Sequence, residues 1–363
     1  MKREHFPYVN ARQNGFSLVE FMVAITVGVI LLAGVLQIYT SSKQISRVEE
    51  ATARLQENGR YAMGFLSNDI RIGASRLCGG LTRQANVPPT NTLNGMAAGF
   101  DFDTGLQGFD ATGAGWSPGA PGINGAPQPG TDILTLRGFI GQGTPLTGVM
   151  LDNNADVQIV PNNGLFSQGN IVMVENCKFA AIMQITNTDP ATTGLLKHAI
   201  GAGPPAPGNA STNLSPNNPP PSFSPGDSEV IGLRTVSYFI GPGTNGGLSL
   251  RSSVNGAASQ ELVEGVDDMQ ILYGEDTTAV VPVNPGDGVA HRYVVAGTAG
   301  LDMRRVVSLR ISLLLRSLDD SVATQPQTIV FNGANVVGGN LAPPDRRIRR
   351  VFTSTVTLMN HTQ

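Results

Sequence analysis

One stretch near the N-terminus constrains the fold more than any other part of the chain. From Phe16 to Tyr39 the sequence runs for 24 residues with Glu20 as its only charge. An α-helix rises about 1.5 Å per residue, so this stretch spans roughly 36 Å, enough to cross the hydrocarbon core of a bilayer with some tilt. A carboxylate inside such a span is costly unless it has a partner. The stretch therefore predicts a membrane-spanning helix whose one acidic residue has a specific role.

The residues before the span indicate its orientation. Residues 1–15 are short and polar, with three basic side chains against one acidic side chain. A basic flank before an apolar run places the N-terminus in the cytoplasm and the rest of the chain across the membrane. A secretory signal peptide would have a shorter apolar core followed by a small-residue cleavage site, and no such site follows Tyr39. We therefore expect a single-pass topology with an extracytoplasmic domain.

The junction GFSLVE, residues 15–20, resembles the processing signal of type IV prepilins and type II secretion pseudopilins. In that family a membrane peptidase cleaves after the glycine and N-methylates the new N-terminal phenylalanine, and the glutamate serves assembly. The resemblance implies these roles for Gly15, Phe16 and Glu20. It also implies the prepilin peptidase as a partner and the bacterial inner membrane as the location before assembly.

The spacing within this signal has a physical reason. Glu20 would lie about one turn from the freed amine of Phe16, so in a staggered helical bundle it can face the terminal ammonium of a neighbour. An ion pair buried in lipid penalises mismatched registers, because an unpaired charge there costs several kcal/mol. The alternative is a plain membrane anchor that happens to contain a glutamate.

Apolar residues continue at helical spacing beyond the span, and no proline interrupts residues 16–87. The spacing predicts a helix of more than 50 residues whose second half lies against a globular domain. The residues that form this apolar stripe are Ile45, Val48, Leu55, Ala62, Leu66 and Ile70. The expected division is a leader at 1–15, a transmembrane and assembly half of the helix at 16–39, an amphipathic half at 40–75, and a β-rich pilin domain at 76–363.

The remainder of the chain alternates strand signals with long loops. The chain has 44 glycines and 24 prolines, and both are frequent in residues 90–130 and 201–226. We expect these two segments to be extended loops. Period-two and apolar runs predict strands at 132–139, 171–174, 179–186, 229–240, 248–252, 306–315 and 351–358. We expect an α+β fold: one long N-terminal helix packed on a largely antiparallel β-sheet domain. The run 306–315, apolar on both faces near its end, is expected to be a central strand.

Several further blocks resemble the PilW branch of minor pilins. They are RLQENGRYAMGFLSNDIR at 54–71, VMVENCKFAAIMQIT at 172–186, and three closing segments at 261–276, 303–317 and 346–360. The family is known to form subcomplexes with other minor pilins that prime pilus assembly at the tip. The resemblance therefore implies a structural subunit that contacts other minor pilins, the major pilin and a tip adhesin.

The chain has two cysteines, Cys78 and Cys177, both in the part expected outside the cytoplasm. A pair in an oxidising compartment favours a disulfide over a metal or redox site. Such a bond would staple the end of the long helix to the sheet. It would close a loop of about 100 residues, for which chain entropy gives up to roughly 4–5 kcal/mol. Two separate buried thiols are the alternative.

No motif indicates catalysis or a cofactor. The four histidines, His5, His198, His291 and His361, are scattered and none has metal-ligand spacing. Asp101, Asp103 and Asp110 suggest a calcium loop but lack the glutamate of an EF-hand, so we expect solvated turns. Gly241, Gly243 and Gly246 have G-x-G-x-x-G spacing, but Pro242 and the absence of a following helix favour a hairpin turn. We expect no metal, no cofactor, no small-molecule substrate and no enzymatic activity.

Three functions remain open at this point. The first is a minor pilin that supports twitching motility, adhesion or DNA uptake from the pilus and cell surface. The second is a J-like minor pseudopilin of a type II secretion system, which shares the prepilin signal and the long helix. The third is a membrane-anchored enzyme, which predicts a pocket with convergent titratable groups. The basic cluster Arg346, Arg347, Arg349 and Arg350 reads either as a solvated strand flank or as a docking surface for an acidic neighbour.

Overall fold

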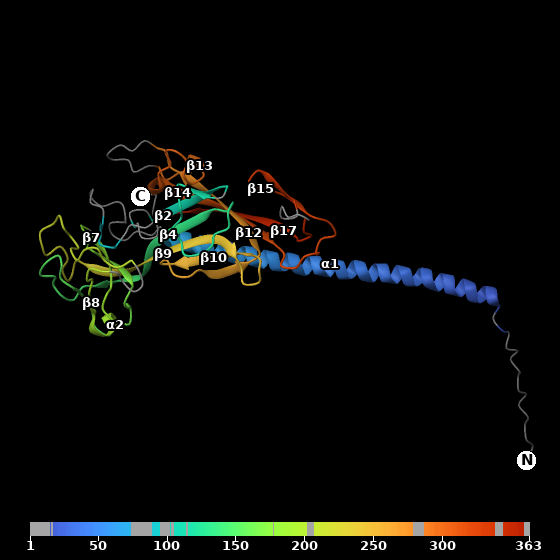
Figure 1. The fold of residues 1–363 in the computed structure, drawn as a ribbon, viewed down its shortest axis with the longest axis horizontal. Coiled ribbons are helices and arrows are strands. Elements are labelled where there is room, and N and C mark those ends of the chain that lie inside the picture. Colours follow the sequence, from blue (N-terminus) through green and yellow to red (C-terminus); the bar gives the residue numbers. More distant parts are fainter. Residues whose placement is uncertain are drawn as a thin grey trace, which may run out of the picture.

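The computed structural model describes residues 15, 17–73, 89–94, 102, 105–113, 115–176, 178–201, 207–278, 287–337 and 344–358. It is elongated: helix α1 (Leu18–Gly73) extends away from a strand-rich domain that packs on its C-terminal part (Figure 1). This architecture confirms the predicted α+β class and the predicted single long helix.

The two halves of α1 have different surroundings. Leu55, Ala62, Leu66 and Ile70 are fully buried against the domain, as their spacing predicts. The stripe begins later than expected, because Ile45 is 57% exposed. The domain first reaches the helix near Gln44, whose side-chain amide donates to the carbonyl of Val322. Ile45, the next residue, therefore lies on a face of the helix that the domain does not cover.

The larger sheet is built around one long strand, β9 (Glu229–Pro242). On one side β9 pairs with β4 (Ile133–Pro145). On the other side its first half pairs with β6 (Ile171–Glu175) and its second half with β10 (Leu248–Val254). The remaining members are β1 (Thr90–Asn91), β7 (Ala180–Gln184), β2 (Leu106–Thr112), β3 (Gly115–Ser117) and β11 (Gln260–Glu264).

The second sheet has the order β13-β12-β14-β17 and is antiparallel throughout. Its strands are β12 (Val266–Glu275), β13 (Arg292–Val294), β14 (Val306–Arg316) and β17 (Arg349–Thr357). β14 lies between two partners and is mostly buried, which confirms the predicted central strand. The smaller elements are β5 (Val157–Gln158) with β8 (Leu195–Leu196), β15 (Thr328–Phe331) with β16 (Ala334–Val337), α2 (Pro190–Thr193) and η1 (Met303–Arg305).

The main core lies where α1 meets both sheets. Leu66 and Ile70 of the helix pack with Tyr238 of β9, Ile271 of β12 and Leu313 of β14. A second core lies in the lobe that contains β5, β6, β7 and β8, at the end of the domain far from the free helix (Figure 1). The fold therefore has a proximal part on the helix and a distal lobe beyond it.

Two contacts fix how the helix sits on the domain. Asp69 accepts hydrogen bonds from the Tyr238 hydroxyl at 2.5 Å and from Arg234 Nη2 at 3.2 Å. Gly59 lies under the ring of Phe352, and a Cβ at this position would collide with the ring. A residue without a side chain is therefore required where the helix approaches β17.

The expectation that residues 90–130 form only a long loop is wrong. Strands β2 and β3 lie within this range, and β2 pairs with β4 from Leu106 to Phe109. Leu106 and Phe109 are buried. Their glycine- and aspartate-containing sequence has low intrinsic strand propensity, and the partner that stabilises β2 lies more than 20 residues away. Tertiary pairing therefore overrides the local signal.

A buried carboxyl group lies opposite a half-buried one where β6 meets β9. Glu175 is 4% exposed and stands directly opposite Glu229 in the sheet register. Its Oε1 makes no hydrogen bond. Burial, with a smaller contribution from the charge of Glu229, raises the pKa of the Glu175 carboxyl to about 7. Glu175 is therefore protonated in the folded protein under conditions where it is ionised in the unfolded chain.

This pair predicts a specific loss of stability at alkaline pH. The pKa of Glu175 is higher in the folded protein than in the unfolded chain. Its contribution to the free energy of unfolding is therefore full below pH 4.5 and is lost as the pH rises through 7. We expect Glu175→Gln to match the wild type at pH 5 and to be more stable by about 1–2 kcal/mol at pH 8.5. Urea unfolding of the detergent-solubilised chain at both pH values measures this. If the unfolding free energies of the variant and the wild type differed by the same amount at both pH values, the prediction would be wrong.

Candidate assembly site on the free helix

The start of α1 is closed by a reciprocal pair of hydrogen bonds. The backbone amide of Ser17 donates to Glu20 Oε2 at 3.0 Å, and the amide of Glu20 donates to Ser17 Oγ at 3.1 Å. This is a capping box, which satisfies two amides that have no partner inside the helix. The S-x-x-E spacing that signals it is readable in the sequence, but the sequence reasoning assigned Glu20 only a partner in another subunit. In the isolated chain, Glu20 caps its own helix.

The residues predicted for processing lie immediately before this cap. Gly15 is exposed, and the space around it is open. Phe16 is outside the described residues, as are Cys78 and Cys177. Cleavage after Gly15, methylation of Phe16 and the disulfide therefore stay predictions.

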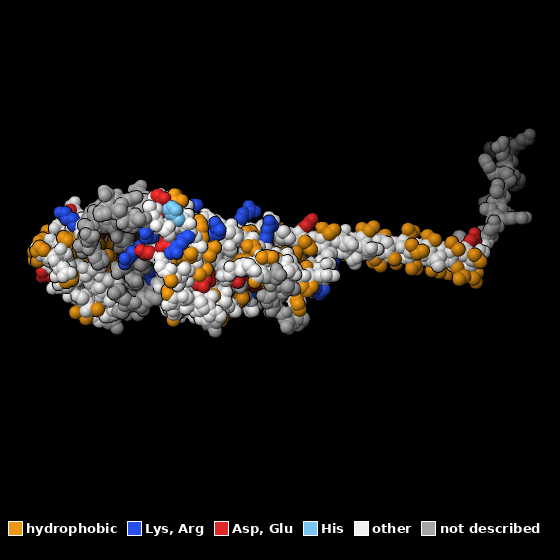
Figure 2. Space-filling model, turned by 90° about the horizontal axis from the view of Figure 1, so that it is seen from above, with side chains coloured by type: hydrophobic (Ala, Val, Ile, Leu, Met, Phe, Trp, Pro, Cys, Tyr) orange, Lys and Arg blue, Asp and Glu red, His pale blue; other side chains and the backbone are white. Residues whose placement is uncertain are grey.

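From Leu18 to Tyr39 every side chain of α1 is exposed. Figure 2 shows hydrophobic side chains along this free part of the helix, with charged residues concentrated on the domain. The large exposed residues are Leu18, Val19, Phe21, Met22, Val23, Ile25, Val27, Val29, Ile30, Leu31, Leu32, Val35, Leu36, Ile38 and Tyr39. The polar group of Thr26 is satisfied within the helix, because its hydroxyl donates to the carbonyls of Met22 and Val23. This surface suits a membrane or a bundle of similar helices better than water.

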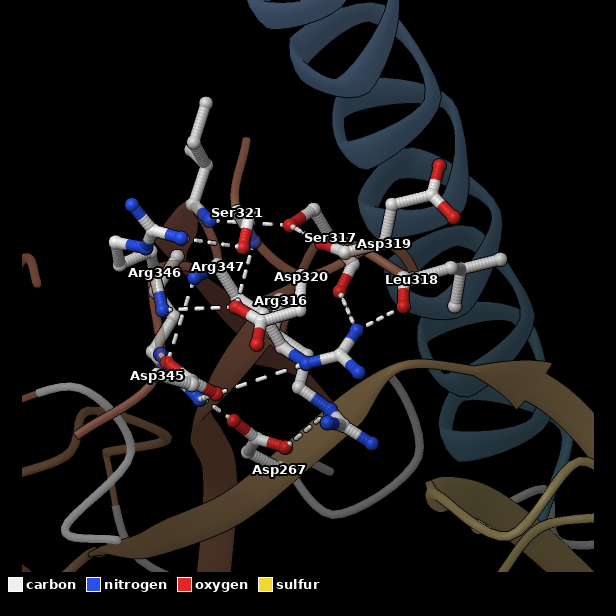
Figure 3. A network of polar contacts seen from close by, with 12 residues as sticks. Asp267, Arg316, Ser317, Leu318, Asp319, Asp320, Ser321, Asp345, Arg346 and Arg347 are labelled. Atoms are coloured by element: carbon white, nitrogen blue, oxygen red, sulfur yellow. Dashed lines mark hydrogen bonds and ion pairs between the residues drawn. The ribbon is translucent and has the colours of Figure 1, made fainter. Parts of the chain in front are cut away.

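A network of charged side chains holds the second sheet together on the side near helix α1 (Figure 3). Arg349 is 3% exposed and forms a bidentate pair with Asp345 at 2.6 and 2.7 Å. It also contacts Asp267 at 3.0 Å, and Asp267 pairs with Arg316 at 2.8 Å. Arg347 donates to the carbonyls of Ser317 and Leu318.

The network changes the interpretation of the basic cluster. Arg347 joins the segment before β17 to the turn after β14, and Arg349 joins β17 to Asp267 of β12 and to Asp345. Arg346 and Arg350 are exposed; Arg346 donates to Ser321 Oγ, and Arg350 lies 5.9 Å from the ring centre of Phe352. The reading as a uniformly solvated flank is therefore wrong for Arg349. Only Arg346 and Arg350 present charge outward.

Two family models match this chain. Residues 10–36 match the prokaryotic N-terminal methylation motif, and residues 237–360 match the model described as Type IV Pilus-assembly protein W. Over these two ranges the chain is similar to type IV minor pilins of the PilW family. No curated protein and no solved structure matches it.

The matched residues coincide with the features described above. The methylation motif covers the capping box and most of the exposed part of helix α1. The PilW match runs from the second half of β9 to just beyond β17 and includes the whole second sheet with its arginine network. The matches imply processing by a prepilin peptidase, contact with pilus components and a membrane-anchored pilin. The blocks at 54–71 and 172–186, which also resemble PilW proteins, lie outside the matched ranges.

One group of potential metal ligands was missed at the sequence level. Asp276, Asp287 and His291 bring their ligand atoms within 4.8 Å of one another. Asp276, however, already accepts the amides of Thr278 and Gly288 and lies 3.7 Å from the guanidinium of Arg305. Burial alone would raise the pKa of Asp276, but these hydrogen bonds and the nearby cation outweigh it and hold the pKa at about 2. The arrangement is that of an ion-paired loop anchor.

The other residues considered for ligand binding have structural surroundings. His198 is buried, its Nε2 lies 2.9 Å from the carbonyl of Thr212, and burial lowers its pKa. Asp110 lies on β2, whereas Asp101, Asp103, His5 and His361 lie outside the described residues. The G-x-G-x-x-G residues form the turn between β9 and β10, with the amide of Gly243 bonded to the carbonyl of Gly247, which confirms the hairpin turn.

A groove lies at the second sheet. It has a volume of about 620 Å³ and is lined by residues that include Asp267, Arg316 and Arg349. These side chains face one another in the ion pairs of Figure 3. Their charges are therefore already used to hold the strands together.

Proposed function

We propose that this chain is a structural minor pilin that, with other minor pilins, primes assembly of the type IV pilus and sits at or near its tip. The observation that supports this best is the exposed apolar helix with Glu20 in its first turn, in a chain that matches the methylation motif and the PilW model. Such a helix is accommodated by lipid before assembly and by neighbouring helices afterwards.

The proposed mechanism is templating. Cleavage after Gly15 frees the amine of Phe16 and leaves α1 as the anchor in the inner membrane. Glu20 of one subunit then faces the terminal ammonium of its neighbour, and this pair sets the register on which the next helix stacks. The partners are the prepilin peptidase, other minor pilins, the major pilin and an adhesin at the tip. Twitching motility, adhesion or DNA uptake would depend on fibres started in this way.

The match to the PilW model over 237–360 supports this reading over the J-like pseudopilin of a secretion system. Both would carry the helix and Glu20, so the helix alone does not separate them. Deleting the gene distinguishes the two. We expect loss of surface pili with protein secretion unchanged, whereas loss of secretion with normal pili would contradict the pilus role.

Intact mass and N-terminal analysis test the processing directly. The protein is purified from its native membrane and from sheared pili without reductant. We expect a chain that begins at N-methylated Phe16 and is two hydrogens lighter than its reduced form, because of a Cys78–Cys177 bond. A chain that begins at Met1, or is cut beyond Tyr39, would contradict the assignment of the processing site.

A further inference from the structure

The last strand of the second sheet, β17, has one free edge. Leu358 donates its amide to the carbonyl of Val307 on the neighbouring chain segment, so the even-numbered residues direct their backbone groups toward β14. The odd-numbered residues direct theirs away from it. The amide of Arg349 confirms this, since it points outward and donates to Gln327 Oε1 at 2.7 Å.

Beyond Arg349 the outward backbone groups have no partner. Within the part of the chain that the structure describes, the outward amides and carbonyls of Val351, Thr353, Thr355 and Thr357 form no hydrogen bond. The three threonines are exposed. Four consecutive outward positions therefore present a regular ladder of donors and acceptors to solvent.

Several other edge strands among the described residues are short or irregular. β1 has two residues, and β3 and β13 have three each. β11 has five residues and a register shift in its pairing with β10. β17 has nine residues, nine successive pairs with β14 without a shift, and no proline. Proteins normally protect a long flat edge of this kind with bulges, prolines or short strands. β17 has none of these.

We propose that the free edge of β17 is a docking site for an extended strand of a different protein, which adds to the second sheet by main-chain hydrogen bonding. The ladder from Val351 to Thr357 fits a partner segment of about five to seven residues. Thr353 and Thr355 favour β-branched or polar side chains opposite them on the outer face.

Charge favours a different protein over a second copy. Arg350 is exposed, and no carboxylate pairs with it within the described residues. The segment 349–358 contains no acidic residue, so a second copy of this edge would leave both arginines unmatched. A partner strand with an aspartate or glutamate near Arg350 completes the edge.

Hydrogen exchange at single-residue resolution tests this inference. Exchange is compared between the full chain purified in detergent and the same chain in the complex extracted from its native membrane. We expect the amides of Thr353, Thr355 and Thr357 to exchange at least about tenfold more slowly in the complex, while those of Phe352 and Ser354 are slow in both states. Equal rates for the threonines in both states would overturn the inference. Protection in the purified chain that rises with its concentration would also overturn it, because the edge would then pair with itself.

A matched pair of variants links the edge to the partner. Thr355→Pro removes an outward amide that β14 does not use, so the strand tolerates it, and it blocks an added strand. Thr355→Ala keeps the backbone unchanged. We expect the proline variant to lose protection at Thr353 and Thr357, with the alanine variant like the wild type. Similar protection in both variants would overturn the inference.

The inference rests on the proposed pilus role in one respect only, namely the assembly in which the partner strand binds. Recovery of the chain in sheared pili is therefore scored separately. Protection of the edge in a membrane complex, without recovery in pili, would leave the docking site standing and remove the pilus role. Recovery in pili together with a freely exchanging edge would leave the pilus role standing and remove the docking site.

Discussion

Replacing Glu20 with alanine is expected to leave cleavage intact and to reduce the amount of this protein in sheared pili by about tenfold or more. The physical reason is that a free ammonium in a lipid-buried bundle, left without its carboxylate, costs several kcal/mol. Quantitative immunoblotting of the membrane and pilus fractions measures both processing and incorporation.

Because Glu20 also caps its own helix, the control variants must separate the loss of the cap from the loss of the charge. Glutamine at position 20 can still accept the amide of Ser17, so Glu20→Gln keeps the cap and removes only the charge. Ser17→Ala does the opposite: it removes the side-chain cap at a cost of about 0.5–2 kcal/mol and keeps the charge. We expect the glutamine variant to fail like alanine and the Ser17 variant to assemble. Normal incorporation of Glu20→Gln would show that capping, and not the ion pair, is what assembly requires.

Replacing Arg349 with alanine is expected to lower the free energy of unfolding by about 3–5 kcal/mol. Arg349 is buried and neutralises Asp345 and Asp267, which are themselves largely buried. Removing the guanidinium would leave Asp345 without its bidentate partner and Asp267 with Arg316 alone, in a region of low dielectric. Urea unfolding of the detergent-solubilised chain, followed by circular dichroism, measures the change.

The neighbouring arginine provides the control for this experiment. Arg350 is exposed and pairs with no carboxylate among the described residues, so Arg350→Ala should change the unfolding free energy by less than about 0.5 kcal/mol. Arg349→Lys keeps the charge but loses the bidentate geometry, and it should fall between the two. A value for Arg349→Ala within about 1 kcal/mol of the wild type would mean that the network does not hold the second sheet.

The sequence predicts the helix and the principal strands of this fold well, because their signals are local. Leu55, Leu66 and Ile70 repeat at helical spacing, and the sequence of β14 is a nearly continuous apolar run near its end. Each signal is therefore contained in a short stretch of sequence. Strand β2 was missed because it depends on β4, more than 20 residues along the chain, for its pairing, and β3 in turn pairs with β2. The position of Ile45 was missed because periodicity shows which face of a helix is apolar but not where a domain begins to cover it.

The candidate site shows a similar division. Glu20 stands out in the sequence because a charge inside an apolar run is unusual. The bond from Ser17 to Glu20 follows from a short-range pattern that was available but unused. By contrast, Arg349 could not be separated from Arg350 in sequence. Adjacent strand residues face opposite sides of a sheet, and the sequence does not show which arginine lies on the side of Asp267 in β12.

The long strand β9 has a mechanical consequence for how force passes through the domain. Val230 belongs to the core of the distal lobe, whereas Tyr238 belongs to the main core and bonds to Asp69 of the helix. A single strand therefore connects the distal lobe to the part of the main core that packs on the helix, with no loop between them. Tension applied to the distal lobe would pass along the backbone of β9 into α1, so the domain would transmit a pull to the membrane or the fibre as one rigid link.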